Sequence, residues 1–203
     1  MFIAIDGPDG VGKTTVARKL VQRLKEAGKG AVYTAEPTQL HTGREIRRIL
    51  QQGTPAEQAG LAELFIEDRR QHLRYEIAPR LAKGVFVVCD RYKYSTISYQ
   101  QLQGDNDVEE LVRMNSEFRV PDFAFIINAA SADVLLGRIE HRAAEKEIFE
   151  DRDTQEAVMQ IYREMKTAYF PDENIIEILV GEKDTPDDVV DVLWQHIFAD
   201  PPA

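Results

Sequence analysis

The sequence contains only one cysteine, Cys89. A lone cysteine excludes an intramolecular disulfide, and the paired-cysteine spacing of a zinc site is missing as well. Such low cysteine usage is typical of a reducing compartment, so we expect a cytoplasmic protein. Cys89 ends an apolar run, and we expect it to be a small core residue rather than a nucleophile.

Long hydrophobic runs are also lacking, because no apolar stretch approaches the roughly 20 residues that a membrane-spanning helix needs. Residues 1–6 have no basic leader and reach an acid after four apolar residues, which predicts neither a signal peptide nor a membrane span. Internal repeats, low-complexity stretches and Pro/Gly-rich linkers are absent too. With 203 residues, 43% of them hydrophobic, the chain fits a single domain over 1–203 that buries a substantial core.

The chain has no excess of positive charge, since its formal net charge is −10. The acidity is concentrated in residues 172–203, where nine acids and one lysine give −8 and leave −2 for the rest of the chain. Nucleic acids and anionic membranes bind to basic surfaces, so we expect neither as a partner. A small phosphorylated substrate is compatible with this charge if basic side chains converge at one site.

Short apolar runs predict β-strands at residues 2–5, 85–89 and 123–127, with weaker candidates at 31–34 and 175–180. Near-continuous apolarity is typical of strands that are covered on both faces of a parallel sheet. Helical patterns alternate with these runs at 14–27, 56–81, 131–144, 154–169 and 186–198, although Pro79 leaves the end of the second helix undefined. The alternation predicts an α/β fold with a five-stranded parallel sheet flanked by helices on both faces.

The strongest motif is Gly-Pro-Asp-Gly-Val-Gly-Lys-Thr at positions 7–14, which matches the phosphate-binding pattern G-x-x-x-x-G-K-[ST] in full. It follows a predicted strand and opens a predicted helix, so that backbone N–H groups and the helix N-terminus would face a phosphate. Lys13 would reach the β- and γ-phosphates, and the Thr14 hydroxyl would ligate Mg²⁺. An ordinary glycine-rich turn is the alternative. We expect ATP to be bound by Gly7, Asp9, Gly10, Val11, Gly12, Lys13, Thr14 and Thr15.

The phosphate loop does not identify the second substrate. The guanine-binding signature Asn-Lys-x-Asp is missing and the chain is short, which disfavours a GTPase and a motor and leaves a kinase. Asp90 and Arg91 follow a predicted strand and lie at its carboxyl end, where open α/β folds bind ligands. Asp90 would hold Mg²⁺ together with Thr14, and Arg91 would clamp an acceptor phosphate. The alternative for these two neighbours is a structural ion pair.

Several segments, spread over most of the chain, resemble thymidylate kinases. The phosphate loop carries an acid at its third position, Asp9, and Thr-Ala-Glu-Pro-Thr at 34–38 resembles the family's Thr-Arg-Glu-Pro segment. Residues 64–72 resemble its Phe-x-x-Asp-Arg-x-x-His helix, residues 90–100 its Asp-Arg-Tyr…Ser…Ala-Tyr-Gln block, and Pro-Asp at 121–122 leads into the fourth strand. The resemblance implies a P-loop kinase fold with a short helical lid at about 138–150. It also implies a homodimer that uses ATP and Mg²⁺ to phosphorylate dTMP.

The predicted acceptor site begins with Phe65 and Arg69, which are four residues apart and would project side by side from one helix. A thymine requires an aromatic ring on which to stack and a donor for a carbonyl oxygen. A core phenylalanine beside a surface arginine is the alternative.

The resemblance implies further acceptor contacts. Asp9 would contact the 3′-hydroxyl of the sugar, and Tyr99 would pack against its C2′ atom and disfavour a ribose. Arg47 matches a basic position of the family and would be a second phosphate contact, unless it belongs to a solvated helix face. The residues implied to bind dTMP are Asp9, Glu36, Pro37, Arg47, Phe65, Arg69, Arg91, Ser95, Thr96, Tyr99 and Gln100.

The catalytic charge has to come from several places. Some members of the family place a catalytic arginine inside the phosphate loop, where this chain has Gly10, so the resemblance implies that lid arginines replace it. Surface pairing with neighbouring glutamates is the alternative for these arginines. Ala35, where the family often has arginine, leaves the acceptor identity open between dTMP and another monophosphate, and a catalytically silent ATP-binding regulator is a further alternative. The implied catalytic residues are Asp9, Lys13, Arg91, Arg138 and Arg142.

Overall fold

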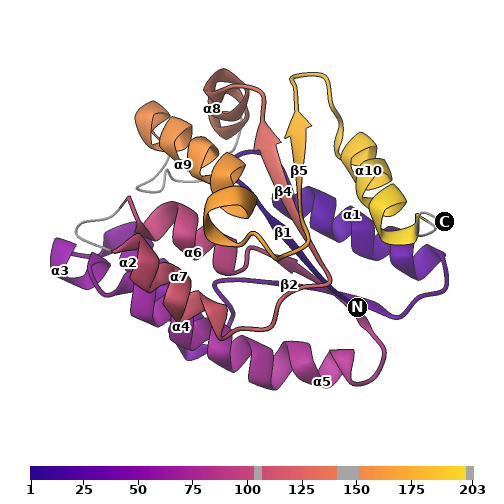
Figure 1. Cartoon of the computed structure of the whole chain (residues 1–203), viewed down its shortest axis with the longest axis horizontal. Helices are drawn as coiled ribbons and strands as arrows, with labels where there is room; N and C mark the ends of the chain where they lie inside the picture. The colour runs from indigo at the N-terminus through magenta and orange to yellow at the C-terminus, as the bar shows by residue number, and fades with distance from the viewer. Residues whose placement is uncertain (103–106, 141–150, 200–203) are drawn as a thin grey trace.

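A computed structural model describes residues 1–102, 107–140 and 151–199, except for the side chains of residues 138–140. Five parallel strands form one sheet in the order β2-β3-β1-β4-β5 (Figure 1). Their bounds are β1 (Phe2–Asp6), β2 (Ala31–Ala35), β3 (Phe86–Asp90), β4 (Phe123–Ala129) and β5 (Ile175–Val180). All five predicted strands and the parallel sheet are therefore confirmed.

Helices connect successive strands. The long helices near the chain ends are α1 (Lys13–Glu26) and α10 (Pro186–Phe198), and two π-helical turns are η1 (Leu73–Ile77) and η2 (Met165–Tyr169). The remaining helices are α2 (His41–Gln52), α3 (Pro55–Gln58), α4 (Leu61–His72), α5 (Ala78–Leu81), α6 (Lys93–Gln100), α7 (Val108–Ser116), α8 (Ala132–Glu140) and α9 (Arg152–Glu164). The expected lid over residues 138–150 lies almost entirely outside the described residues.

Alternating side chains of the strands supply two hydrophobic cores. In β1, Ile3 and Ile5 face a core that is completed by α1, α8 and α10. Phe2 and Ala4 face the opposite core, which is completed by α4, α6, α7 and α9. Because both faces of the sheet are covered, both sets of side chains are apolar, and the continuous apolar runs of the sequence follow from this burial.

The helix expected over residues 56–81 is not continuous. It is interrupted at Gly60 between α3 and α4, and the π-helical turn η1 precedes Pro79 in α5. Proline has no N–H to donate to the carbonyl four residues earlier, and a local change of helical pitch accommodates that loss. The sequence patterns predicted no helix at α6 or α7, and the structure adds both.

The acidic C-terminal segment has a structural use in packing α10 against α1. Lys19 of α1 pairs with Asp187 at 2.8 Å, and Arg23 pairs with Asp191. Thr185 caps the N-terminus of α10 by accepting the backbone N–H of Asp188 at 3.3 Å. Acidic side chains are favoured in the first turn of a helix, so this concentration of negative charge stabilises the helix.

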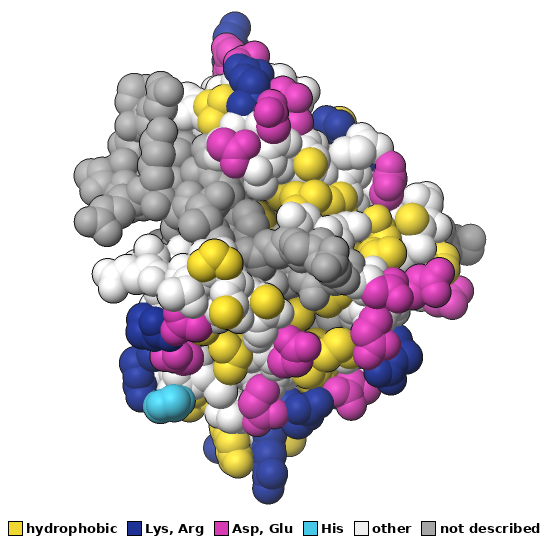
Figure 2. Space-filling model, turned by 90° about the vertical axis from the view of Figure 1, so that its left-hand side faces the viewer, with side chains coloured by type: hydrophobic (Ala, Val, Ile, Leu, Met, Phe, Trp, Pro, Cys, Tyr) yellow, Lys and Arg dark blue, Asp and Glu magenta, His cyan; other side chains and the backbone are white. Residues whose placement is uncertain are grey.

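The face of the molecule shown in Figure 2 carries basic and acidic side chains that are interspersed around hydrophobic ones. On this face the described residues form no continuous basic stripe of the kind that binds a nucleic acid backbone. Among the residues that the structure describes, no helix has the length and apolarity required to cross a membrane.

The register of the sheet places the carboxyl ends of β1, β2 and β3 next to one another. Ile5 of β1 is opposite Asp90 of β3, and Asp90 is in turn opposite Ala35 of β2. The loops that leave β1, β2 and β3 therefore emerge side by side. The carboxyl ends of the strands are where a parallel α/β sheet binds its ligands.

Candidate active site

The phosphate loop connects β1 to α1 and is shaped by glycines. Gly7 has φ 145° and passes so close to β4 that a Cβ atom there would lie 2.0 Å from the carbonyl oxygen of Ile127. Gly12 has φ 101° and caps α1 in a left-handed conformation. These conformations are accessible to glycine and let successive backbone N–H groups curl around an anion.

Lys13 lies at the start of α1 with its side chain folded back over the loop. Its Nζ donates to the carbonyl oxygen of Pro8 at 2.7 Å and lies 3.8 Å from a carboxylate oxygen of Asp9. Burial lowers the pKa of Lys13 to about 8, and the positive charge of Arg91 contributes to the shift. The ammonium group is thus held beside the loop, where a polyphosphate would stabilise its charged form.

Thr14 and Asp90 meet as predicted across α1 and β3. The Thr14 hydroxyl donates to Asp90 Oδ2 at 2.5 Å. Hydroxyl and carboxylate oxygens are ligands that Mg²⁺ prefers, and they lie next to the phosphate loop, so the residues fit the expected metal. Tyr33 also donates to Asp90 Oδ2, at 3.1 Å, and the sequence patterns assigned this tyrosine no role.

Arg91 occupies a left-handed backbone conformation with φ 67°, which is uncommon for a residue with a side chain. Asp6, at the end of β1, accepts the backbone N–H of Tyr92 at 3.0 Å and the hydroxyl of Ser95. Burial raises the pKa of the Asp6 carboxyl, and these two hydrogen bonds oppose the shift. Asp6 therefore anchors the turn that presents Arg91, a role that an acid at a strand end signals only weakly in sequence.

The guanidinium of Arg91 forms an ion pair with Asp9 of the phosphate loop, not with its neighbour Asp90. The other oxygen of Asp9 accepts the Tyr99 hydroxyl at 2.9 Å. The alternative of an Asp90–Arg91 pair is therefore wrong in this structure. Arg91 and Tyr99 instead connect β3 and α6 to the loop that follows β1.

One cavity of about 710 Å³ joins the phosphate loop to α2, α4 and α6. It brings together most of the predicted site: Asp9, Gly10, Gly12, Lys13, Thr14, Thr15, Glu36, Pro37, Arg47, Phe65, Arg69, Asp90, Arg91, Ser95, Thr96, Tyr99 and Gln100. Gly7 and Val11 are predicted members that do not line it, and both are buried. Sequence reasoning missed Gln39, Leu50 and Tyr92.

At the far end of the cavity, Phe65 and Arg69 lie on α4 as expected. Phe65 is half-buried, whereas Arg69 has only 1% of its surface exposed, so the alternative of a surface arginine is wrong. Arg69 donates from both Nε and Nη2 to Oε2 of Glu36, at 2.9 and 2.7 Å. It also donates to Asn115 at 2.6 Å and to Thr96 at 3.0 Å.

Arg47 lines the cavity from α2 and is directed toward the segment after β2. Its guanidinium donates to the carbonyl oxygens of Pro37, at 2.8 Å, and Thr38, at 2.7 and 2.9 Å. The alternative of a solvated helix face does not describe it. Arg44 remains exposed and donates to the carbonyl of Gln39 at 2.8 Å.

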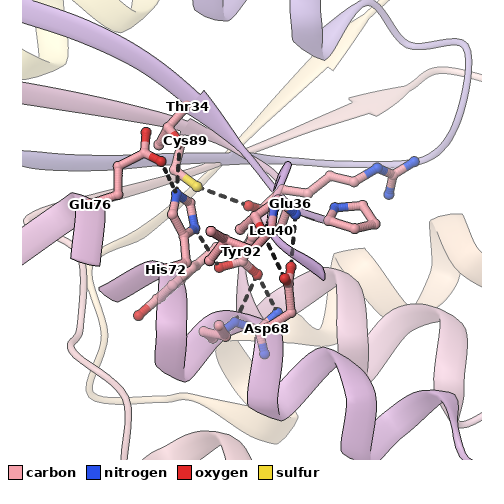
Figure 3. Close-up of polar contacts among 12 residues, drawn as sticks. Thr34, Glu36, Leu40, Asp68, His72, Glu76, Cys89 and Tyr92 are labelled. Carbon is pink, nitrogen blue, oxygen red and sulfur yellow. Dashed lines mark hydrogen bonds and ion pairs between the residues drawn. The ribbon is translucent and has the colours of Figure 1, made fainter. Parts of the chain in front are cut away.

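Glu36, His72 and Cys89 form a buried cluster in which one ligand atom from each residue lies within 4.8 Å of the other two (Figure 3). Such a group has the donor types of a metal site. However, Glu36 is already paired with Arg69, and burial raises the pKa of the Cys89 thiol well above its ordinary value. Metal binding needs a thiolate, so the cluster fits a hydrogen-bonded core better.

The two lid arginines lie outside what the structure describes in detail. Arg138 falls in α8, but its side chain is not among the described parts, and Arg142 lies outside the described residues. Their expected catalytic role stays a prediction.

Comparisons with known proteins identify the family. A family model described as thymidylate kinase matches residues 5–183. The chain belongs to the thymidylate kinase family. A probable thymidylate kinase of Pyrococcus horikoshii is 33% identical over 202 residues, 97% of each chain. One of Methanococcus vannielii is 40% identical over 172 residues, 83% of this chain and 81% of the relative.

A solved thymidylate kinase structure from Candida albicans, described as having a broad substrate specificity, shares the fold with a TM-score of 0.80 and 25% identity. The match covers 97% of this chain and 90% of that one. The resemblance and the P-loop kinase fold predicted from the sequence are thus confirmed.

Proposed function

We propose that this member of the thymidylate kinase family transfers the γ-phosphoryl group of ATP to dTMP and forms ADP and dTDP. In this reaction the bond from the γ-phosphorus to the β–γ bridging oxygen breaks, and a bond to an oxygen of the acceptor phosphate forms. The observation that carries the proposal is one cavity that is lined by the phosphate loop, by Arg91 and by the Phe65–Arg69 pair.

The donor end has the groups that a triphosphate requires. The loop backbone and the N-terminus of α1 would cradle the phosphates, and Lys13 would neutralise the β- and γ-phosphates. Mg²⁺, held by Thr14 and Asp90, would supply further neutralisation of phosphate charge when bound. The Thr14–Asp90 contact at 2.5 Å supports this pairing of ligands.

The acceptor needs no general base. A phosphate monoester has a second pKa near 6, so its oxygen is already largely anionic at neutral pH. The main barrier is the repulsion between two polyanions, which favours catalysis by positioning and charge neutralisation. Arg91 lines the cavity and is paired with Asp9 of the phosphate loop, which fits a clamp on the acceptor phosphate.

The acceptor end has the chemistry of a pyrimidine site. Phe65 offers a ring for stacking, and Arg69 and Thr96 border the same space with polar groups that are fixed by hydrogen bonds. The Tyr99 hydroxyl donates to Asp9 of the phosphate loop, and Tyr99 would restrict the sugar from there. Arg47 is proposed as a second contact of the phosphate, once it exchanges a backbone carbonyl for the ligand.

Arg138 and Arg142 are proposed to complete the charge around the γ-phosphoryl group, because the loop itself supplies only Gly10 at the position where some family members have arginine. Transfer to water has to be suppressed, which is the physical reason for a closing lid. Their replacement by alanine, one at a time, should lower kcat for dTMP with little change in its KM.

The experiment that tests the function is a substrate panel. ATP consumption is measured with dTMP, dUMP, dCMP, dGMP and UMP as acceptors, with and without Mg²⁺. The proposal predicts the highest kcat/KM for dTMP and a need for Mg²⁺. A higher kcat/KM for another monophosphate would replace dTMP as the substrate, and ATP binding without turnover on any of them would indicate a silent regulator.

We also propose a homodimer in a cytoplasmic setting. The face in Figure 2 gathers hydrophobic side chains among charged ones, as subunit interfaces commonly do. Cys89 is free and buried, which suits a reducing compartment. Light scattering of the purified protein should give twice the monomer mass, and a monomer mass at micromolar concentration would exclude the dimer.

A further inference from the structure

A buried hydrogen-bonded chain lies behind the acceptor end of the cavity. Thr34 of β2 contacts His72 Nε2 through its hydroxyl at 2.7 Å, and His72 Nδ1 lies 3.1 Å from Oε1 of Glu36. Figure 3 shows His72 reaching from α4 between Thr34 and Glu36. His72 is completely buried, and neither it nor Thr34 is among the residues that line the cavity. His72 therefore has no route to touch a substrate.

The donors and acceptors fix the direction of this chain. An ionised Glu36 only accepts hydrogen bonds, so His72 Nδ1 carries the proton that it donates. Its Nε2 is then an acceptor and takes the proton of the Thr34 hydroxyl, and a carboxylate oxygen of Glu76 lies 4.0 Å from the same nitrogen. One tautomer of His72 thus satisfies both hydrogen bonds, and the position of its proton is assigned from the hydrogen-bond network.

This arrangement divides the two oxygens of Glu36 between two partners. His72 occupies Oε1, and both donating nitrogens of Arg69 converge on Oε2. The last torsion of a glutamate side chain is soft, so a carboxylate without a partner on Oε1 would rotate. Both oxygens would then compete for the guanidinium, and the plane of Arg69 would turn with them.

The Arg69 guanidinium has little freedom to absorb such a rotation. It also donates to Asn115 of α7 and Thr96 of α6, it lies over the rings of Tyr92 and Phe118, and the side chain is 1% exposed. A guanidinium that turns would have to give up some of these contacts. A change of orientation would therefore alter the face that Arg69 presents to the cavity, beside Phe65.

We infer that His72 is a positioning residue for the acceptor base, which acts through Glu36 to fix the guanidinium plane of Arg69. The role rests on the proposed function, because it assumes an acceptor whose base carries a hydrogen-bond acceptor for Arg69. It assigns His72 to binding of the monophosphate and not to binding of ATP.

Three variants test this role. His72→Leu removes both nitrogens, and His72→Asn retains a donor near the position of Nδ1. Thr34→Val removes only the hydroxyl that contacts His72 Nε2. The matched control is Ile66→Ala, which also weakens buried packing of α4 but lies outside the chain of contacts and the cavity lining.

We expect the variants to change KM for dTMP much more than KM for ATP. His72→Leu should raise KM for dTMP about tenfold and leave KM for ATP within about twofold, because one charge-assisted contact is misaligned. His72→Asn should restore most of the affinity, and Thr34→Val should raise KM for dTMP about threefold. Ile66→Ala should change both KM values by less than about twofold.

A double-mutant cycle tests the path. In an Arg69→Ala background, His72→Leu should cause no further rise in KM for dTMP, because the residue through which it acts is gone. A similar rise in both backgrounds would refute action through Arg69. An unchanged KM for dTMP in His72→Leu, or equal changes of KM for dTMP and ATP, would overturn the positioning role. If His72→Leu does not fold, the KM values of His72→Asn and Thr34→Val decide the question.

The wild-type panel separates this inference from the proposed function. If the wild type turns over another monophosphate and not dTMP, the function is refuted and the variants are compared with that acceptor. If no monophosphate is turned over, calorimetric affinity for dTMP replaces KM. Absence of dTMP binding to the wild type would overturn both.

Discussion

Lys93 begins α6 with its side chain completely buried, and its ammonium group forms an ion pair with Glu173. Tyr94 donates to the other oxygen of Glu173 at 2.6 Å, and Lys93 Nζ lies 4.6 Å from the ring centroid of Phe170. Burial lowers the pKa of Lys93, and the Glu173 carboxylate opposes the shift. Lys93→Met keeps the length of the side chain and removes the charge, so Glu173 is left without its cation.

Breaking a buried ion pair from one side costs about 3–5 kcal/mol. The Glu173 side chain is 11% exposed, so we expect the lower end, about 3 kcal/mol of unfolding free energy. In a chain of this length about 1 kcal/mol lowers Tm by about 2–4 °C, so Tm should fall by about 6–12 °C. Glu173→Gln, which strands the Lys93 ammonium, should cost a similar amount.

The double variant Lys93→Met/Glu173→Gln should lose about as much as one single variant, not the sum of about 6 kcal/mol, because no uncompensated charge remains. Urea and thermal unfolding followed by circular dichroism measure the three values. The control is Lys19→Met, which removes an exposed pair with Asp187 and should cost less than about 1 kcal/mol. Additive losses in the double variant would refute the buried pair as a coupled unit.

Three further predictions concern catalysis. Lys13→Met should lower kcat about 10²–10³-fold, measured by coupled ADP release, because the variant has no charged donor for the phosphates; a smaller loss than tenfold would contradict its role. Phe65→Ala should raise KM for dTMP about tenfold and leave KM for ATP unchanged, since base stacking contributes about 1–3 kcal/mol; an unchanged KM would refute the stacking site. Asp90→Asn should raise the Mg²⁺ concentration for half-maximal activity about tenfold, and an unaltered Mg²⁺ titration would exclude Asp90 as a metal ligand.

The phosphate loop was predictable from sequence because its geometry depends on neighbours in the chain. A strand, a glycine-rich turn and a helix in succession place Lys13 and Thr14 with no distant contact required. The turn after β3 was less predictable. Asp90 and Arg91 were correctly predicted to lie at the carboxyl end of a strand. The Asp6 carboxylate that anchors the turn, however, comes from β1, 84 residues earlier than Asp90 in the chain.

At the acceptor end, helical spacing predicted which residues share a helix but not which of them are buried. Four-residue spacing correctly set Phe65 and Arg69 on one helix, yet it left the burial of Arg69 open. Burial is decided by Glu36, Thr96 and Asn115, which come from three other segments of the chain. The role of His72 could not be predicted from spacing either, because its hydrogen bond with Thr34 depends on the packing of α4 against β2.

The sequence by itself determined the fold class and the phosphate loop, because these depend on local patterns of apolar and glycine residues. Most of the residues that line the cavity were predicted through the resemblance to thymidylate kinases. The tertiary structure decided which charges pair. Arg91 pairs with Asp9 instead of its neighbour Asp90, and Arg69 is held by Glu36 in a core that no local pattern identifies. Ion pairs and buried hydrogen bonds join residues that are distant in the chain, and the packing of α4 and α6 on the sheet brings them together.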